Sequence, residues 1–431
     1  MKLVALLMFT LSTVAVAQQP ADDNAALAPF INEATVGIER YDLTKLAIAD
    51  TRKWLLDAAR AAKSNPRQSQ YLSYLEKGSD LPRIMKVHEQ LSAAGVTRVY
   101  VVFTTAILAD PPAFLLVPLQ DKADPQKIIT ALQSLAPEST SARNELVPQQ
   151  LAGAIVLVPK IALPGLKTLR AAERSDLLSA MQAAGDAPIA GGFALSPAVS
   201  MIFEQSMPTI PLINRPTSDI TRNFRTASLA ATPGTDPRVS ITVQATHAQG
   251  AQVLQSVIAD FAKLAASPSQ RNQTPPIPQP QVNNDTLKLD LGGASLAAAT
   301  FGLIDIRLKS QLADTMSRTR AILQICYNYK FNVEKGDRSW PADLETLVKS
   351  GQLKPNMLTN PRFPDQSPGF IYVRPPGNEK QVNGQTTIVL YESVPAGTPS
   401  IVAGYADGHA QLLAADEFKQ QLEQNKPAAK K

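Results

Sequence analysis

The sequence predicts an α+β protein: two α+β units with the ferredoxin-like element order strand–helix–strand–strand–helix–strand, then a domain with one long helix and a small antiparallel sheet. Three observations carry this prediction. A chain of 431 residues is too long for one ordinary core. Short apolar runs typical of strands alternate with segments whose apolar residues recur every three or four positions, as in helices. The order of segments in 28–160 returns in 161–293 at low identity, which indicates an internal repeat.

Strand and helix patterns define the first unit, 28–160. Asp124 is typical of a helix N-cap because its carboxylate can accept hydrogen bonds from first-turn amides, and Pro125 fits that turn. In chain order, the expected elements are a strand over 34–43, a helix capped by Thr44, a helix over about 79–93, two strands over 96–106 and 112–120, a helix from Asp124 and a strand over 153–160.

The second unit, 161–293, repeats this order and ends in a polar segment and a strand. Residues 267–284 are rich in Pro, Gln and Asn, so we expect a flexible loop there and a domain boundary after the strand that follows. In chain order, the expected elements are a strand over 187–196, a helix from Pro197, two strands joined through 233–236, an amphipathic helix carrying Val253, Val257, Phe261 and Leu264, and a strand over 285–292.

The last domain, 294–424, begins with a long helical pattern whose apolar stripe includes Leu303, Leu312 and Ile322. Four short β runs and a terminal helix follow, and residues 425–431 form a polar tail that we expect to be disordered. In chain order, the expected elements after the long helix are a short helix within 341–351, strands near 370–375, 386–393, 401–406 and 409–413, and a helix over 415–424.

The N-terminal residues predict export. Lys2 precedes an uncharged apolar run that closes on Ala15-Val16-Ala17, a pattern typical of a signal peptide, 1–17, cut before Gln18. The run is shorter than the ~20 residues that a spanning helix needs, so we expect no membrane span in the mature chain. The expected location is the periplasm or outside the cell. The single cysteine, Cys326, cannot form an internal disulfide, so the fold must rely on its cores.

Charge argues against a nucleic-acid partner. The net charge is +5, and Lys and Arg are scattered without a basic run interleaved with aromatic residues. Isolated His88 and His247 belong to no metal-binding motif, so no transition-metal site is predicted. Gly191 and Gly192, which precede a helix, suggest either anion binding by backbone amides or, as we favour, close packing of a strand.

The last third of the chain resembles type II secretion pseudopilins, and more closely the pseudopilin-like exported proteins of Planctomycetes and their relatives. The resemblance covers roughly 300–415. Its residues are Leu323, Tyr329, Trp340, Pro341, Leu344, Leu347, Tyr391, Glu392, Pro395, Asp407, Gly408 and His409. It implies a long helix, a short helix and an antiparallel sheet that ends in an Asp-Gly-His hairpin. The long helix is internal here and interrupted by charged residues such as Asp305, so the resemblance does not extend to assembly into a pseudopilus.

Asp407-Gly408-His409 is the most conspicuous polar motif. Asp-Gly between two β runs predicts a two-residue hairpin turn in which both residues have positive φ. The alternative is a Ca²⁺ site built from Asp407, loop carbonyls and Glu392. Hard cations take about six to eight oxygen ligands, and only two acidic side chains are in view, so the turn is favoured. We expect no other cofactor.

Taken together, these observations favour an exported protein of the cell envelope that is not an enzyme and acts as a binding or structural module, with envelope proteins as partners. Two alternatives stay open. One is a secreted hydrolase whose site is assembled from residues distant in sequence. The other is an accessory protein of a secretion system. The sequence predicts neither the ligand nor the oligomeric state.

Overall fold

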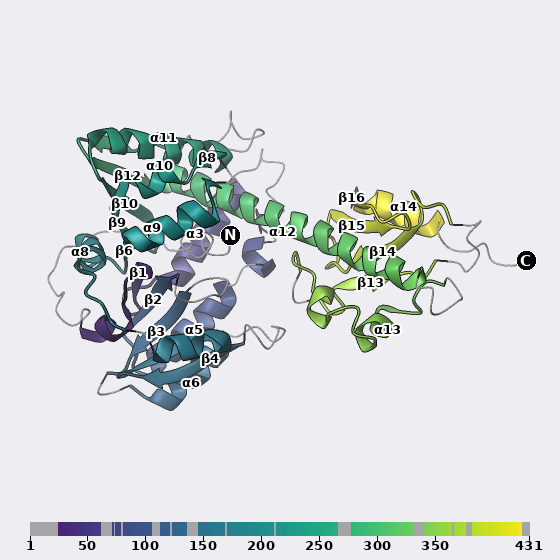
Figure 1. Ribbon diagram of the computed structural model, residues 1–431, viewed down its shortest axis with the longest axis horizontal. Coiled ribbons are helices and arrows are strands. Elements are labelled where there is room, and N and C mark those ends of the chain that lie inside the picture. Colours follow the sequence, from purple (N-terminus) through teal and green to yellow (C-terminus); the bar gives the residue numbers. More distant parts are fainter. Residues whose placement is uncertain are drawn as a thin grey trace, which may run out of the picture. The chain divides into compact units, whose positions relative to one another are not determined.

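A computed structural model of the protein (Figure 1) describes thirteen segments, and the statements below concern these segments. The chain divides into two compact units, Met1–Asp305 and Ile306–Lys431. The predicted signal peptide (1–17) and tail (425–431) lie outside the described residues, which are 25–61, 71–72, 74–78, 81–105, 113–120, 123–135, 145–168, 170–210, 213–265, 277–331, 339–363, 366–375 and 382–424.

The first unit contains one continuous ten-stranded sheet in which neighbouring strands are antiparallel. Its strand order is β11-β12-β10-β9-β6-β1-β2-β3-β5-β4, and Figure 1 labels all of these strands except β11 and β5. The strands are β1 (Thr35–Asp42), β2 (Arg98–Thr104), β3 (Ala113–Pro118), β4 (Leu146–Leu151), β5 (Ala154–Pro159), β6 (Ile189–Ala194), β9 (Phe224–Thr232), β10 (Arg238–Ala245), β11 (Gln281–Asn283) and β12 (Thr286–Gly292).

The predicted repeat is visible as two halves with the same topology. In the first half, β1 pairs with β2, β2 with β3, and β3 with the second strand of the β4–β5 hairpin. In the second half, β6 pairs with β9, β9 with β10, and β10 with the second strand of the β11–β12 hairpin. The two halves are joined by the antiparallel pairing of β1 with β6. We call this pairing the seam.

The mixed α+β class is confirmed, but the ferredoxin-like order does not produce the ferredoxin sheet. That sheet interleaves its strands through split βαβ crossovers. Here, strands next to each other in each half are also next to each other along the chain, apart from the inverted last hairpin. The reason is that β1 pairs directly and antiparallel with β2, and β6 with β9, so no other strand lies between them. Each half also ends in a hairpin where the sequence analysis expected one strand. The β4–β5 turn is made by Ala152 and Gly153, both with positive φ (44° and 77°), as a two-residue hairpin requires.

Helices follow the strands much as predicted, with several differences. Asp124 does cap α6, accepting from the amides of Gln126 and Lys127. Thr44 caps no helix, because α3 begins at Ile48 and Thr44 instead donates to Asp42. Helices α7, α8 and α10 and strands β4 and β11 were not predicted. The helices of this unit are α3 (Ile48–Ala61), α5 (Leu81–Ala93), α6 (Pro125–Gln133), α7 (Leu163–Lys167), α8 (Ser175–Ala183), α9 (Pro197–Ser206), α10 (Ser218–Thr221) and α11 (Ala248–Ala265).

Short elements complete the first unit. They are the 3₁₀ turns η1 (Ala28–Phe30) and η3 (Lys160–Ala162), the π-helical turn η2 (Tyr74–Gly78), and the two-residue strands β7 (Thr209–Ile210) and β8 (Arg215–Pro216). The predicted loop over 267–284 is described only from residue 277. Its end is not a loop, because β11 pairs there with β12.

Both faces of the sheet are covered near the seam. Alternate residues of a strand point to opposite faces. Ile38 of β1 and Ala190 of β6 pack with Leu177 and Met181 of α8 in one core. On the other face, Tyr41 belongs to a core with residues of β6, β9, β10 and β12, with Trp54 of α3 and with the start of the long helix α12 (Gly293–Lys330). Charged residues on β1 are therefore enclosed, unlike those on a sheet with one solvated face.

The second unit combines the rest of α12 with a four-stranded antiparallel sheet of order β13-β14-β15-β16, close to the prediction. Ile322, Leu323 and Cys326 of α12 pack against this sheet and against buried Trp340. The remaining elements are α13 (Leu344–Lys349), the 3₁₀ turn η5 (Pro355–Leu358), β13 (Phe370–Tyr372), β14 (Ile388–Glu392), β15 (Ser400–Tyr405), β16 (Ala410–Ala414) and α14 (Ala415–Gln424).

Candidate functional site

The motif Asp407-Gly408-His409 lies in the connection between β15 and β16, as expected, but the turn differs from the predicted one. Gly408 donates its amide to the Tyr405 carbonyl at 2.9 Å, and Tyr405 donates to the His409 carbonyl at 2.9 Å. Three residues, 406–408, therefore separate the paired ends. Gly408 alone takes the positive φ (92°) that follows a β-turn in three-residue hairpins, so Asp407 needs none.

The side chains of this turn are held by each other. Oδ1 of Asp407 accepts from the His409 amide at 3.0 Å and lies 2.5 Å from His409 Nδ1. The His409 ring stacks on the Tyr405 ring with centroids 4.2 Å apart. Partial burial acts to raise the pKa of Asp407, but the His409 amide and ring outweigh it, and the pKa lies below its usual value. The turn thus uses its polar atoms for its own geometry, while the His409 side chain stays 41% exposed.

An aromatic patch adjoins the turn. Tyr327 of α12 donates its hydroxyl to the Ala406 carbonyl, which fixes the end of the helix against the turn. Phe331, 53% exposed, stacks on Tyr327 with centroids 5.9 Å apart, and Tyr327 meets the buried Trp340 ring edge-on at 5.2 Å. Tyr327, Phe331 and His409 are called the aromatic patch below. Lys330 Nζ lies 5.2 Å from the ring centroid of Phe331, so a cation accompanies the patch.

The second Ca²⁺ candidate, Glu392, lies at the opposite end of β14 from Asp407. Asp407 donates its amide to Gly384, which precedes β14, whereas Glu392 is the last residue of that strand. The structure does not bring the two carboxylates together. Within the described residues, no group of three or more His, Cys, Asp or Glu side chains is placed to hold a metal ion.

Glu392 is the centre of a buried polar network. Its Oε1 accepts from Arg362 Nη1 and, at 2.7 Å, from the Val402 amide, and its Oε2 accepts from Asn360 Nδ2 at 3.0 Å. The Asn360 Oδ1 in turn accepts from Thr315 of α12 at 3.2 Å. Burial raises the pKa of Glu392, and the Arg362 charge and the three hydrogen bonds oppose that rise. Every carboxylate oxygen has a partner, so this network ties the sheet to the helix.

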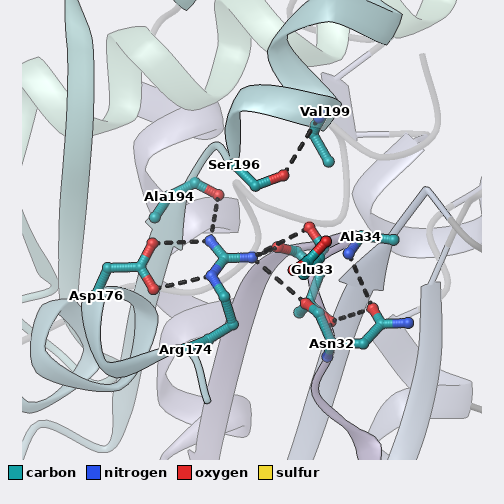
Figure 2. Close-up of polar contacts among 9 residues, drawn as sticks. Asn32, Glu33, Ala34, Arg174, Asp176, Ala194, Ser196 and Val199 are labelled. Carbon is teal, nitrogen blue, oxygen red and sulfur yellow. Dashed lines mark hydrogen bonds and ion pairs between the residues drawn. The ribbon is translucent and has the colours of Figure 1, made fainter. Parts of the chain in front are cut away.

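Arg174 forms a second saturated cluster that the sequence analysis missed (Figure 2). The guanidinium pairs with both oxygens of Asp176 at 2.9 Å, from Nε and Nη2. Its other contacts are backbone carbonyls, including Thr35 at 2.5 Å at the start of β1 and Ala194 at 3.2 Å at the end of β6. The side chain is 7% exposed. Arg174 therefore connects both seam strands to the start of α8, and it has no free donor to offer a ligand.

Glu39, also missed, lacks this saturation. It is fully buried on β1, and its Oε2 accepts from the Tyr41 hydroxyl at 2.5 Å. Its Oε1 is buried with no hydrogen-bond partner. Burial raises the pKa of Glu39 to about 7, against the opposing effect of the Tyr41 hydrogen bond. A strand pattern with alternating polarity would assign Glu39 to solvent, and only the cover on both faces of the sheet makes it a buried acid.

The remaining candidates have structural partners. His88 Nε2 lies 2.9 Å from the Leu43 carbonyl, and His247 Nδ1 accepts from the Gly250 amide at 2.8 Å. Cys326 is buried as expected, and burial raises its pKa to about 12, which suppresses the thiolate. Gly192 packs directly under α8: a Cβ there would lie 2.4 Å from the Leu177 carbonyl oxygen. This close packing is the interpretation that the sequence analysis favoured for Gly191 and Gly192.

In comparisons with known proteins, no family model, no curated protein and no solved structure matches this chain. Among the described residues, no helix is long and apolar enough to cross a bilayer.

Proposed function

We propose that the protein is an exported, non-catalytic binding or structural module of the cell envelope, periplasmic or secreted, with a pseudopilin-like last domain. The N-terminal sequence pattern supports export. The element order of the second unit supports the resemblance: a long helix, the short helix α13, and a four-stranded sheet that ends in the Asp407-Gly408-His409 hairpin.

The observation that carries the binding role is the aromatic patch. Phe331 is 53% exposed, and its ring stacks on that of Tyr327, which restricts the conformations open to it before any partner arrives. Exposed, preorganised aromatic rings are typical anchors of protein interfaces, because they bury much area at little entropy cost. The neighbouring Lys330 and Asp407 supply charges of both signs at its rim. We therefore expect envelope proteins to dock there.

The test compares two exposed apolar side chains. Phe331→Ala removes the patch anchor, and Met201→Ala removes a similarly exposed side chain (56%) from α9 in the other unit. Mature wild-type protein and each of the two variants are immobilised, and the proteins that each retains from native envelope extract are compared, with and without Ca²⁺. We expect wild type and Met201→Ala to retain the same envelope protein, Phe331→Ala to retain at least about tenfold less, and Ca²⁺ to change nothing.

Several results would contradict the proposal. Equal retention by all three proteins would exclude the aromatic patch as the docking surface. Retention that requires Ca²⁺ and is lost in Asp407→Asn would favour the metal site. Export is tested separately by cell fractionation and N-terminal sequencing, with Gln18 expected as the first residue. A cytoplasmic protein that retains Met1 would exclude the envelope role.

A further inference from the structure

Glu39 occupies the middle of the joint between the two halves of the large sheet. The seam pairs five residues of β1 with five of β6, from Gly37 with Phe193 to Tyr41 with Ile189, and the central pair is Glu39 with Gly191. A Cβ at Gly191 would lie 3.1 Å from the Phe193 ring, 3.2 Å from Leu229 and 3.4 Å from Glu39 Cγ. Glycine therefore leaves the space that the Glu39 side chain and the Phe193 ring share.

Among the residues that the structure describes, no cation bonds to the carboxyl group in this space, and Tyr41 is the only titratable group bonded to Glu39. Arg40, the next residue on β1, belongs to the opposite face and donates to the Gly185 and Ala187 carbonyls. Directly opposite Glu39 on the flanking strands are Val101 of β2 and Gly191, neither of which is charged.

Several charged groups on α3 and α12, the helices whose residues pack on this face, bond to residues other than Glu39. On α3, Lys53 and Arg60 both pair with Asp57. On α12, the buried Asp305 accepts from the Tyr71 hydroxyl at 3.0 Å. The buried Nε of Arg52 on α3 has no hydrogen-bond partner, so it makes no bond to Glu39. The pKa of Glu39 is set by burial, which raises it, and by Tyr41, which lowers it.

We propose that Glu39 is a proton-operated switch of the seam. With its carboxyl protonated, the seam encloses a neutral group, and the two halves stay paired. Loss of the proton places an unpaired negative charge between β1 and β6, and the seam opens to hydrate it. An isolated charge in such surroundings is costly, because neither water nor a counter-ion solvates it. This inference concerns the first unit and does not depend on the proposed docking surface of the second.

The direction of the pH effect follows from the two states. In the open state, Glu39 has its ordinary pKa of 4.5, and in the closed state its pKa is about 7. Below pH 4.5 both states hold the proton, and the seam has its full stability. Between these values only the closed state keeps the proton, so rising pH favours opening. Above about pH 7 both states are ionised, and the effect levels off.

The experiment measures amide hydrogen exchange by mass spectrometry at pH 5 and pH 8, corrected for the intrinsic exchange rate. Peptides that contain β1 and β6 report on the seam, and peptides from β15 and β16 serve as an internal control. For wild type we expect seam protection to fall on the order of 100-fold between the two pH values. Glu39→Gln, which has nearly the same shape and no titration, should keep its seam protection at pH 8.

Tyr41→Phe provides the second variant, which keeps the acid and removes the bond that lowers its pKa. Its seam should start to open at the same pH as that of wild type, but opening should level off only at a higher pH.

The proposal is overturned if wild-type seam protection is equal at pH 5 and pH 8, or if Glu39→Gln shows the same fall as wild type. It is also overturned if the β15 and β16 peptides lose protection in parallel, because the transition would then not be specific to the seam.

Discussion

The two units of this protein each bury a glutamate at the end or centre of a sheet strand, and they treat it differently. Glu392 in the second unit has an arginine, an asparagine and a backbone amide around its carboxylate. Glu39 in the first unit has one tyrosine hydroxyl and one oxygen without a partner. Burial raises the pKa of both groups, so desolvation is common to them and the partners make the difference.

The comparison separates two uses of a buried acid. A fully paired carboxylate links elements: Glu392 connects β14 and β15 with the loop at Asn360 and, through it, with α12. A buried carboxylate with too few partners makes stability depend on pH, because its environment stabilises the neutral form better than the charged form. Four measurements would test this distinction, and the largest effect is expected where a paired acid is made into an unpaired one.

Arg362→Met removes the cation from Glu392 and leaves a buried, uncompensated carboxylate. We expect the second unit to lose about 3–5 kcal/mol of its free energy of unfolding at pH 8. The pKa of Glu392 then rises further, so protonation relieves the charge and the loss should be smaller at pH 5. Denaturant unfolding at both pH values measures this. Equal losses at pH 5 and pH 8 would mean that Arg362 acts through packing and not through its charge.

The substitution of glutamate by glutamine should change the free energy of unfolding in opposite directions at Glu39 and at Glu392. Glu39→Gln removes the ionisation penalty and should stabilise the protein at pH 8 by about 3 kcal/mol, the equivalent of a pKa difference from 4.5 to about 7. Glu392→Gln leaves Arg362 without its counter-ion and should cost about 2 kcal/mol. The measurement is the free energy of unfolding of both variants at pH 8. If both variants were stabilised, or both destabilised, the distinction between the two acids would be wrong.

Tyr41→Phe tests the single bond that Glu39 makes. The hydroxyl donates to Oε2 at 2.5 Å, and its loss should cost about 1 kcal/mol at pH 8, where the acceptor is charged. The cost should be smaller at pH 5, because the hydrogen bond favours the ionised carboxylate. A cost that is the same at both pH values would indicate that Tyr41 stabilises the fold by packing alone.

Asp407→Asn tests an exposed carboxylate, for comparison with the buried Glu39 and Glu392. Its side chain is 36% exposed and bonds to His409, and asparagine keeps the oxygen that accepts from the His409 amide. We expect a change of less than about 0.5 kcal/mol in unfolding free energy, as for most exposed ion pairs. Thermal unfolding of this variant is compared with that of Arg362→Met. The difference shows how much of the stability change at a carboxylate site comes from burial. A loss above 2 kcal/mol would contradict this ranking.

Much of the fold could be predicted from local pattern. The strands that became β1, β6 and β12 stand out by alternation or apolar content, and Asp124 marks the start of α6 by its chemistry. Strand β4 was missed because "LVPQQL" contains Pro and Gln, and β11 because it follows a polar, proline-rich stretch. Both are edge strands, where pairing on one side suffices and apolar content is not required.

The site residues were harder to predict because their environment is set by distant segments. Asp407 and Glu392 are separated only by 15 positions in sequence, yet they lie at opposite ends of β14. Glu39 could not be identified as buried from "VGIERYD", since that depends on β6, α3 and α12 covering the strand. Arg174 was equally hidden, because its partners are carbonyls of strands far away in the chain.

The central position of β1 has a consequence for how the chain acquires its fold. Strands β1 to β5 precede β6 in the chain, so the first half can assemble while β1 is still an open edge. An open edge strand invites pairing with other chains, and an inward-pointing charge is one of the devices that discourage it. In that unfinished state Glu39 meets water and ionises, so the residue that later opposes the seam would first act as a gatekeeper against aggregation.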